Sequence, residues 1–209
     1  MVKIKICGLT NESDARVACR LGANFIGVVV SPESSRKVTN EQAISILKTK
    51  TPFISSVVVT SSTRLTDIED IVCNIAPDLI QLHGDIHPSL LERLEFHGKL
   101  IKTIPICEGV DYAKYFKGYG HLVSSFLLDT KAGNRLGGTG IVGDWDLSAK
   151  IVKESPKPVF LAGGLTPENV FEAVKKVKPY SLDICTGVEE KIGKKSEEKM
   201  RKLIELSRP

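Results

Sequence analysis

Two side chains in this 209-residue sequence stand where they could move protons at a bound substrate. Cys7 closes the first strand-like segment, in which apolar residues alternate over residues 2–6, and Asp129 closes another one, directly after three apolar residues. Burial raises the pKa of a carboxyl group and suits it to act as a general acid, whereas a thiol must shift toward thiolate to act as a base. The pair indicates proton-transfer isomerisation. The alternatives are a buried filler cysteine and a carboxylate that only accepts structural hydrogen bonds.

Glycine-rich turns indicate a phosphate site. Gly163 and Gly164 close one apolar run, and Thr186 and Gly187 follow the last one. Backbone N–H groups in such turns bind anions, and the N-terminus of a following helix adds a favourable dipole. Gly138, in the stretch 137–140, could reach the same phosphate or serve as a hinge. The two later turns favour phosphate binding over glycines that only shape the chain.

Two further polar side chains are candidates for substrate binding. Arg36 lies in the loop after the second strand-like segment, where its guanidinium could bind a carboxylate with two hydrogen bonds. A solvated surface charge is the alternative. His83 ends the fourth segment, and a lone histidine there is more consistent with binding or structure than with catalysis.

Strand-like and helix-like segments alternate along the whole chain. The strand-like ones are residues 2–7, 25–30, 54–60, 79–83, 100–106, 121–129, 159–163 and 181–185. Such alternation implies parallel strands joined by right-handed crossovers. Eight units of this length predict an α/β protein, a single (β/α)8 TIM barrel over residues 1–209. The candidate residues lie at or after the carboxyl ends of strands, where such barrels place their active sites.

Local signals mark where helices begin. Thr39 precedes a helix-like segment, and Thr166 is expected to cap another helix whose first position is Pro167. The last helix is expected over 196–206. The stretch 130–144 is long and rich in glycine, which is typical of a functional loop.

Composition restricts the class of protein. Apolar residues make up 42%, charged residues 26%, and the net charge is +4 with a pI near 8.7. This balance suits a globular protein with an anionic substrate and is too weakly basic for nucleic-acid binding. Apolar runs are too short for a membrane span, and the start does not resemble a signal peptide. Five cysteines without metal-type spacing predict a reduced, cytoplasmic protein with no disulfide framework and no metal.

The strand ends together resemble phosphoribosylanthranilate isomerase of tryptophan biosynthesis. The matching motifs run in family order along essentially the entire chain: Lys5-Ile6-Cys7-Gly8-Leu9-Thr10, Pro32-x-Ser34-x-Arg36-x-Val38, Gln81-Leu82-His83-Gly84, Leu127-Leu128-Asp129, Gly137-Gly138-Thr139-Gly140 with Asp144-Trp145, Leu161-Ala162-Gly163-Gly164-Leu165, and Asp183 with Gly187-Val188-Glu189.

The resemblance implies a (β/α)8 barrel, monomeric or homodimeric, that carries out an Amadori rearrangement without metal or cofactor, the third step from chorismate. It implies that Asp129 protonates the furanose ring oxygen, that Cys7 removes the C2′ proton, and that Arg36 binds the anthranilate carboxylate. The backbone around Gly163-Gly164 and Thr186-Gly187-Val188 would hold the phosphate, and Asp183 would orient the last strand end or the sugar.

The chain departs from the family pattern at three places. Cys185-Thr186 stands where two serines are common, Gly143 where phenylalanine is common, and Ser196 where aspartate is common. Because strand eight adjoins strand one in a closed barrel, Cys185 is expected near Cys7. We therefore predict that oxidation could inactivate the enzyme through this pair.

Three other classes of protein compete with this resemblance. The histidine-pathway isomerase performs the same chemistry but has a phosphate site in each half, and the first half here lacks a glycine-pair loop. An aldolase needs a lysine on a strand, for which Lys102 is the only internal candidate. A non-catalytic sugar-phosphate binder would have lost the acid or the base, and both are present.

Overall fold

Eight parallel strands close into a barrel in the computed structural model, which describes residues 1–94, 96, 99–107, 109–132, 135–136 and 143–208. The strands follow the order β5-β4-β3-β2-β1-β9-β8-β6, and β5 pairs with β6 to complete the ring. Their bounds are β1 Lys3–Ile6, β2 Phe25–Val29, β3 Ser55–Thr60, β4 Leu79–Leu82, β5 Leu100–Ile106, β6 Ser125–Ala132, β8 Val159–Leu161 and β9 Ser181–Ile184. The predicted TIM barrel is confirmed.

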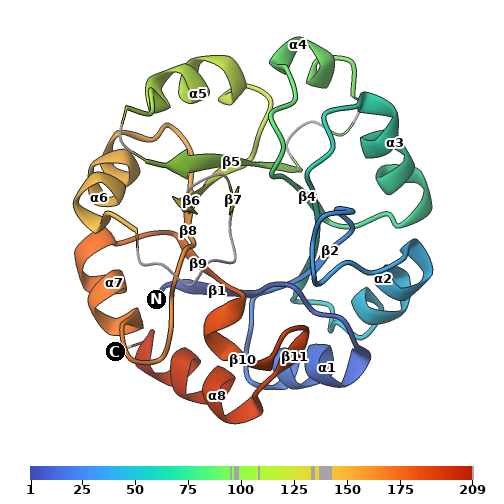
Figure 1. Cartoon of the computed structure of the whole chain (residues 1–209), viewed down its shortest axis with the longest axis vertical. Coiled ribbons are helices and arrows are strands. Elements are labelled where there is room, and N and C mark those ends of the chain that lie inside the picture. The colour runs from blue at the N-terminus through green and yellow to red at the C-terminus, as the bar shows by residue number, and fades with distance from the viewer. Residues whose placement is uncertain (95, 97–98, 108, 133–134, 137–142, 209) are drawn as a thin grey trace.

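Helices form the outer ring of the barrel (Figure 1). They are α1 Glu12–Arg20, α2 Asn40–Leu47, α3 Leu65–Asn74, α4 Pro88–Leu91, α5 Tyr112–Tyr119, α6 Trp145–Glu154, α7 Val170–Val177 and α8 Glu197–Leu206. The predicted cap at Thr39 is confirmed, because its side chain and that of Gln42 each bond the other's backbone N–H. Ser196 caps α8 in the same region that the sequence predicts.

Two predicted boundaries are wrong. Strand β6 begins at Ser125 rather than at residue 121, because the backbone N–H groups of Leu122 and Val123 still bond to Tyr119 and prolong the turn after α5. Helix α7 begins at Val170 rather than at Pro167. The side chain of Asn169 accepts a hydrogen bond from the backbone of Thr166, which holds residues 166–169 in a turn before the helix.

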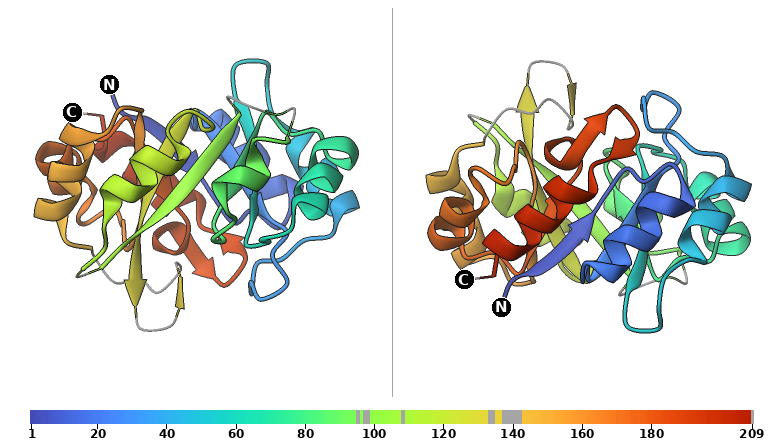
Figure 2. Two further views of the ribbon diagram at one scale, coloured as in Figure 1. Left: turned by 90° about the horizontal axis from the view of Figure 1, so that it is seen from above. Right: turned by 90° about the horizontal axis from the view of Figure 1, so that it is seen from below.

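Short elements add to the carboxyl face of the barrel. Strand β7 (Arg135–Leu136) folds back antiparallel on the end of β6, and β10 (Glu189–Lys191) pairs with β11 (Lys194–Lys195) as a hairpin. The 3₁₀ turn η1 (Thr186–Val188) links β9 to that hairpin. Figure 2 shows β7 and the β10–β11 hairpin at the same end of the barrel, opposite the end at which the N-terminus lies.

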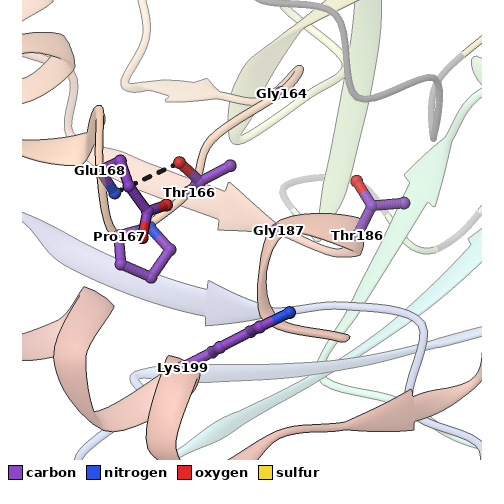
Figure 3. Close-up of a pocket in the computed structure, with 7 residues that line it drawn as sticks. All are labelled: Gly164, Thr166, Pro167, Glu168, Thr186, Gly187 and Lys199. Carbon is purple, nitrogen blue, oxygen red and sulfur yellow. Dashed lines mark hydrogen bonds between the residues drawn. The ribbon is translucent and has the colours of Figure 1, made fainter. Parts of the chain in front are cut away.

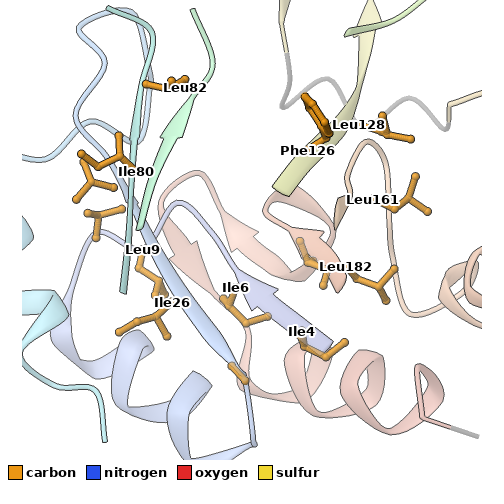
Figure 4. Packing of buried hydrophobic residues seen from close by; sticks show 14 of the residues in the cluster. Ile4, Ile6, Leu9, Ile26, Ile80, Leu82, Phe126, Leu128, Leu161 and Leu182 are labelled. Atoms are coloured by element: carbon orange, nitrogen blue, oxygen red, sulfur yellow. The ribbon is translucent and has the colours of Figure 1, made fainter. Parts of the chain in front are cut away.

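The two-residue period of the strands separates two apolar layers. One set of strand side chains packs under the helices, and Figure 4 shows Ile4, Ile6, Phe126 and Leu128 among them. The other set fills the barrel interior with a separate buried cluster of Phe25, Val57, Ile101, Leu127, Phe160 and Ala162. Two residues further along β4, β5 and β6, on the same inward face, the side chains become polar: Gln81, Thr103 and Asp129. The packed interior thus forms a floor beneath a polar layer.

Candidate active site

A buried lysine joins the polar side chains of the barrel interior. Lys5 is 0% exposed, and its Nζ lies 3.2 Å from Cys7 Sγ, 2.6 Å from Gln81 Oε1 and 3.0 Å from Asp183 Oδ1. The register of β1 against β9 pairs Lys5 directly with Asp183. Three strands therefore converge on one ammonium group.

Sequence reasoning missed Lys5, although a signal was available. Lys5 precedes Cys7 by two residues on a strand, so both side chains must point to the same face. A lysine on the inward face of a buried strand is unusual enough to single out. The prediction that Lys102 is the only internal lysine is wrong on this account.

Lys102 points into the layer between the barrel and the helices instead. Its Nζ donates to the carbonyl oxygen of Gly84 at 2.8 Å and lies over the rings of Tyr115 and Tyr119 in α5. Burial lowers the pKa of Lys102 to about 8. Because its side chain points away from the barrel interior, Lys102 is not placed to serve as the strand lysine of an aldolase.

Cys7 is buried beside Lys5, and the two influences on its proton oppose one another. Burial raises the pKa of the Cys7 thiol to about 12, while the charge of Lys5 and its hydrogen bond act to lower it. The shift toward thiolate that a base requires is therefore not present in the site as it stands. Gly27 leaves room for the pair, because a Cβ there would lie 3.1 Å from Cys7 Sγ and 3.1 Å from Lys5 Cε.

Asp129 has the properties of a general acid. It lies at the inward face of β6 and is only 9% exposed, and burial raises its pKa to about 7. The negative charge of Asp183 adds to this rise, whereas the backbone N–H of Thr130 and the charge of Lys5 oppose it. Cys7 and Asp129 thus share two electrostatic neighbours, Lys5 and Asp183, in one polar layer.

Arg36 lies across Gly8 and forms a two-point ion pair with Glu189. Glu189 is the first residue of β10. Arg36 Nε lies 2.7 Å from Glu189 Oε1, and Arg36 Nη2 lies 2.7 Å from Glu189 Oε2. The positive φ of Gly8 and its missing Cβ make this approach possible, because a Cβ there would lie 2.8 Å from Arg36 Cδ. The guanidinium is thus mostly covered rather than a solvated surface charge, with its side chain 11% exposed.

Glu189 holds a second cation as well. Lys195 Nζ, on β11, lies 3.1 Å from Glu189 Oε1 and donates to the carbonyl of Cys185 at 2.9 Å. Burial alone would raise the pKa of Glu189, but hydrogen bonds from Arg36 and the charge of Lys195 hold it below its ordinary value. The carboxylate of Glu189, which is distant from Arg36 in the sequence, therefore orients the Arg36 guanidinium. The spacing of residues in the sequence does not predict this pair.

A pocket lies between the two predicted glycine turns. Its lining is drawn in Figure 3 and comprises Gly164, Thr166, Pro167, Glu168, Thr186, Gly187 and Lys199. Gly163 and Gly164 both have positive φ, and an added Cβ at Gly187 would collide with the carbonyl of Leu165. Glycine is therefore required at these turns, where the chain approaches itself closely.

Lys199 adds a positive charge that the sequence prediction lacked. It extends from α8 toward the η1 turn (Figure 3), and its Nζ donates to the backbone carbonyl of Glu189 at 2.8 Å. The amide of Asn169 fixes the opposite wall by donating to the carbonyl of Gly164 at 2.8 Å. Backbone turns and one ammonium group thus converge on one pocket, which suits an anion.

Three further residues named in the sequence analysis are His83, Gly138 and Cys185. His83 follows β4, and its backbone N–H donates to the carbonyl of Thr60 at 2.8 Å. Gly138 lies outside the described residues. Cys185 follows β9, which pairs with β1 as expected, and both Cys185 and Cys7 are free thiols. Their linkage under oxidation stays a prediction.

No group of three or more His, Cys, Asp or Glu side chains is placed to hold a metal ion among the residues that the structure describes. Within the same part of the chain, every helix is too short or too polar to cross a membrane.

Known proteins match the chain over its whole length. The family model for N-(5'-phosphoribosyl)anthranilate (PRA) isomerase matches residues 4–206. A relative of that name from Methanocella arvoryzae is 39% identical, with 100% of this chain and 99% of the relative covered.

Two solved structures of phosphoribosylanthranilate isomerase are also similar. One shows monomers generated from the dimeric enzyme of Thermotoga maritima and is 28% identical, with a TM-score of 0.85 over 99% of this chain and 98% of its own. The other holds reduced 1-(o-carboxyphenylamino)-1-deoxyribulose 5-phosphate and is 29% identical with a TM-score of 0.85 over the same shares.

Proposed function

The chain belongs to the N-(5'-phosphoribosyl)anthranilate isomerase family, and we propose that Cys7 and Asp129 are the general base and general acid of its reaction. The enzyme isomerises N-(5'-phosphoribosyl)anthranilate to the corresponding 1-deoxyribulose 5-phosphate in tryptophan biosynthesis. The observation that carries the assignment of roles is electrostatic. Asp129, whose pKa burial raises to about 7, and the Cys7 thiol share the charged neighbours Lys5 and Asp183.

The reaction divides into two proton transfers. Asp129 gives its proton to the furanose ring oxygen, the bond from C1′ to that oxygen breaks, and the nitrogen lone pair forms an iminium ion. Cys7 thiolate then takes the proton from C2′. The C–H electron pair becomes a C1′–C2′ double bond and the iminium electrons return to nitrogen, giving an enolamine. Transfer of the hydroxyl proton from C2′ and protonation of C1′ yield the ketone.

The charge of the iminium ion compensates for the burial of Cys7. At pH values between about 7 and 12 the two groups hold a single proton, which resides mainly on sulfur. The reactive arrangement is the tautomer with the proton on Asp129 and the charge on Cys7. A cation forming at C1′ stabilises a neighbouring thiolate, so the thiol becomes acidic as the ring opens.

The two ends of the substrate fit the two other charged regions. The anthranilate carboxylate pairs with Arg36, whose Nη1 lies 3.4 Å from Ser35 Oγ, outside the pair with Glu189. The phosphate occupies the pocket at Gly163-Gly164 and Thr186-Gly187, with Lys199 beside it. His83 and Gly138 are proposed to contact the substrate, and Asp183 is proposed to orient the sugar through Lys5.

Arg36→Met is expected to raise KM about 10- to 100-fold with little change in kcat. The loss of a charge-assisted hydrogen bond from Nη1 to a carboxylate is worth about 1.5–3 kcal/mol, and this contact is present in both ground and transition states. Steady-state kinetics would measure both constants. Arg64→Met, at an exposed arginine paired with Asp67, is the matched control and should change neither. A fall in kcat with constant KM would contradict the assignment.

Isomerase activity itself is tested by the fall in anthranilate fluorescence when the purified chain is given N-(5'-phosphoribosyl)anthranilate. Turnover without added metal or cofactor is expected. The phosphate of a bound product, or free phosphate, should occupy the pocket between the two glycine turns. Absence of turnover in a folded preparation would favour the non-catalytic sugar-phosphate binder.

We also propose that residues 1–209 form one catalytic domain in the cytoplasm. Pairing of β1 with β9 joins the two ends of the chain in one sheet. All five cysteines are free, which suits a reducing compartment.

The assembly we propose is a homodimer formed through the loop between α2 and β3. Phe53 in that loop is 96% exposed, beside a pocket lined partly by Ile44, Leu47, Pro52 and Ile75. An aromatic ring held in water next to an apolar pocket is the pattern of an interface anchor. A related enzyme is described as dimeric, which makes a second copy of the chain the expected occupant.

Phe53→Asp is expected to convert the dimer to a monomer. Because the ring is exposed within one chain, its loss should leave the fold unchanged. Light scattering coupled to size exclusion would show a mass of 22.8 kDa in place of twice that value. A wild-type protein that is monomeric at every concentration would refute the dimer.

A further inference from the structure

We propose that Lys5 is a positioning residue of this active site: its ammonium group fixes the Cys7 sulfur and stabilises the thiolate that removes the C2′ proton. The proposal rests on the proposed role of Cys7 and extends it to a residue outside the predicted set. The contacts of Lys5, its surroundings and its cost to the fold all support it.

Two hydrogen bonds and one ion pair hold the ammonium group of Lys5. Lys5 Nζ donates hydrogen bonds to Gln81 Oε1 and Cys7 Sγ, and it forms an ion pair with Asp183 Oδ1. The two oxygens are strong acceptors, while a neutral thiol is a weak one. The bond to sulfur therefore gains most when the thiol loses its proton. The oxygens of Gln81 and Asp183 fix the ammonium group where it meets that sulfur.

Among the charges that face Cys7, Lys5 is the cation that donates a hydrogen bond to its sulfur. Asp183 on β9 and Cys185 beyond it act against the thiolate, while Lys5 acts for it. Arg36 also interacts electrostatically with Cys7, but its Nε and Nη2 are bound to Glu189. Burial would lower the pKa of Lys5, but Asp183 and Cys7 outweigh burial and raise it above its ordinary value, so the amine stays charged.

Stability alone does not account for a lysine at this position. A buried ion pair costs desolvation free energy that its attraction often fails to repay, and apolar side chains of similar volume replace such pairs at little cost. The residue that packs against Lys5 and Cys7 is Gly27, and a larger side chain at that position would crowd both of them. A site arranged in this way favours a role in chemistry over one in packing.

The test compares Lys5→Met with Lys102→Met. Both lysines are buried on barrel strands, but only Lys5 contacts Cys7. Lys5→Met is expected to lower kcat/KM at least tenfold and to move the pH at which kcat/KM stops rising to higher values, since Lys5 also holds down the pKa of Asp129. Iodoacetamide alkylation of Cys7 at pH 8.5, followed by peptide mass spectrometry, should slow at least tenfold. Lys102→Met should change neither measurement.

Lys5→Gln separates charge from hydrogen bonding, because glutamine keeps N–H donors without a charge. It is expected to behave as Lys5→Met does. If Lys5→Met does not fold by circular dichroism, Lys5→Met/Asp183→Asn removes both partners of the ion pair and is measured instead. A folded variant without Lys5 whose Cys7 is alkylated at the wild-type rate would overturn the proposal. Alkylation is measured without substrate, so its outcome is separate from that of Cys7→Ala, which tests the function itself.

Discussion

Cys7→Ala is expected to lower kcat by about two to four powers of ten, with the protein still folded. A single positioned acid or base contributes about this much to a proton-transfer reaction. The thiol is the side chain of the polar layer that gains a reactive charge on losing its proton beside Lys5. Its removal takes away the base that we assign to the C2′ proton. The anthranilate fluorescence assay would follow both the variant and the wild type.

Two further variants make the Cys7 result specific. Cys7→Ser keeps the size and position of the side chain but replaces the thiol with a far weaker acid, so it should be nearly as inactive as Cys7→Ala. Cys73→Ala removes an exposed thiol on α3 and should leave kcat unchanged. Near-full activity of Cys7→Ala would exclude the two-step mechanism in the form given above.

The sequence predicted the parts of the site that depend on strand ends. Cys7, Asp129 and the glycine turns each follow an apolar run of period two, and the closed sheet brings those ends to one face. The same period could have located Lys5, since residues 5 and 7 of one strand share a face. Lys5 lies inside the strand, however, and the prediction covers only residues at strand ends.

Contacts between distant segments could not be predicted in this way. Arg36 and Glu189 are 153 positions apart, and their ion pair depends on a hairpin, β10–β11, that carries no strong periodic signal in so few residues. The pKa of Cys7 is likewise a property of packing. The sequence shows that a thiol closes β1, but only the structure shows that burial outweighs the charge of Lys5.

Asp129→Asn is expected to lower kcat by about two to four powers of ten as well, because an amide cannot supply the proton that opens the ring. The shape and volume of the side chain are retained, so the loss would be chemical. Asp85→Asn, at an exposed carboxylate beyond β4, is the matched control and should keep kcat near wild type. An active Asp129→Asn enzyme would show that ring opening uses another donor.

The pH dependence of the wild-type enzyme follows from the same two groups. Below about pH 7 both Asp129 and Cys7 carry protons, and the reactive species with one proton becomes tenfold rarer for each unit of pH. Above pH 7 the single-proton state dominates, so kcat/KM should be constant. The rise therefore reports the pKa of Asp129, even though that group acts as the acid. A profile that instead falls above pH 7 would mean that the proton is lost from the site altogether.

Asp129 should also cost the folded protein stability, and this gives its variant a second measurable effect. The folded state raises the pKa of this carboxyl from 3.8 to about 7, so it binds the proton more tightly than the unfolded chain does. The cost is absent below pH 3.8 and grows until about pH 7, because ionisation becomes progressively easier in the unfolded chain than in the buried site. The difference in free energy of unfolding between Asp129→Asn and wild type should therefore rise by about 3 kcal/mol, in favour of the variant, when the pH is raised from 5 to 8. Guanidinium unfolding at the two pH values would measure it, and an unchanged difference would mean that Asp129 is not buried as an acid.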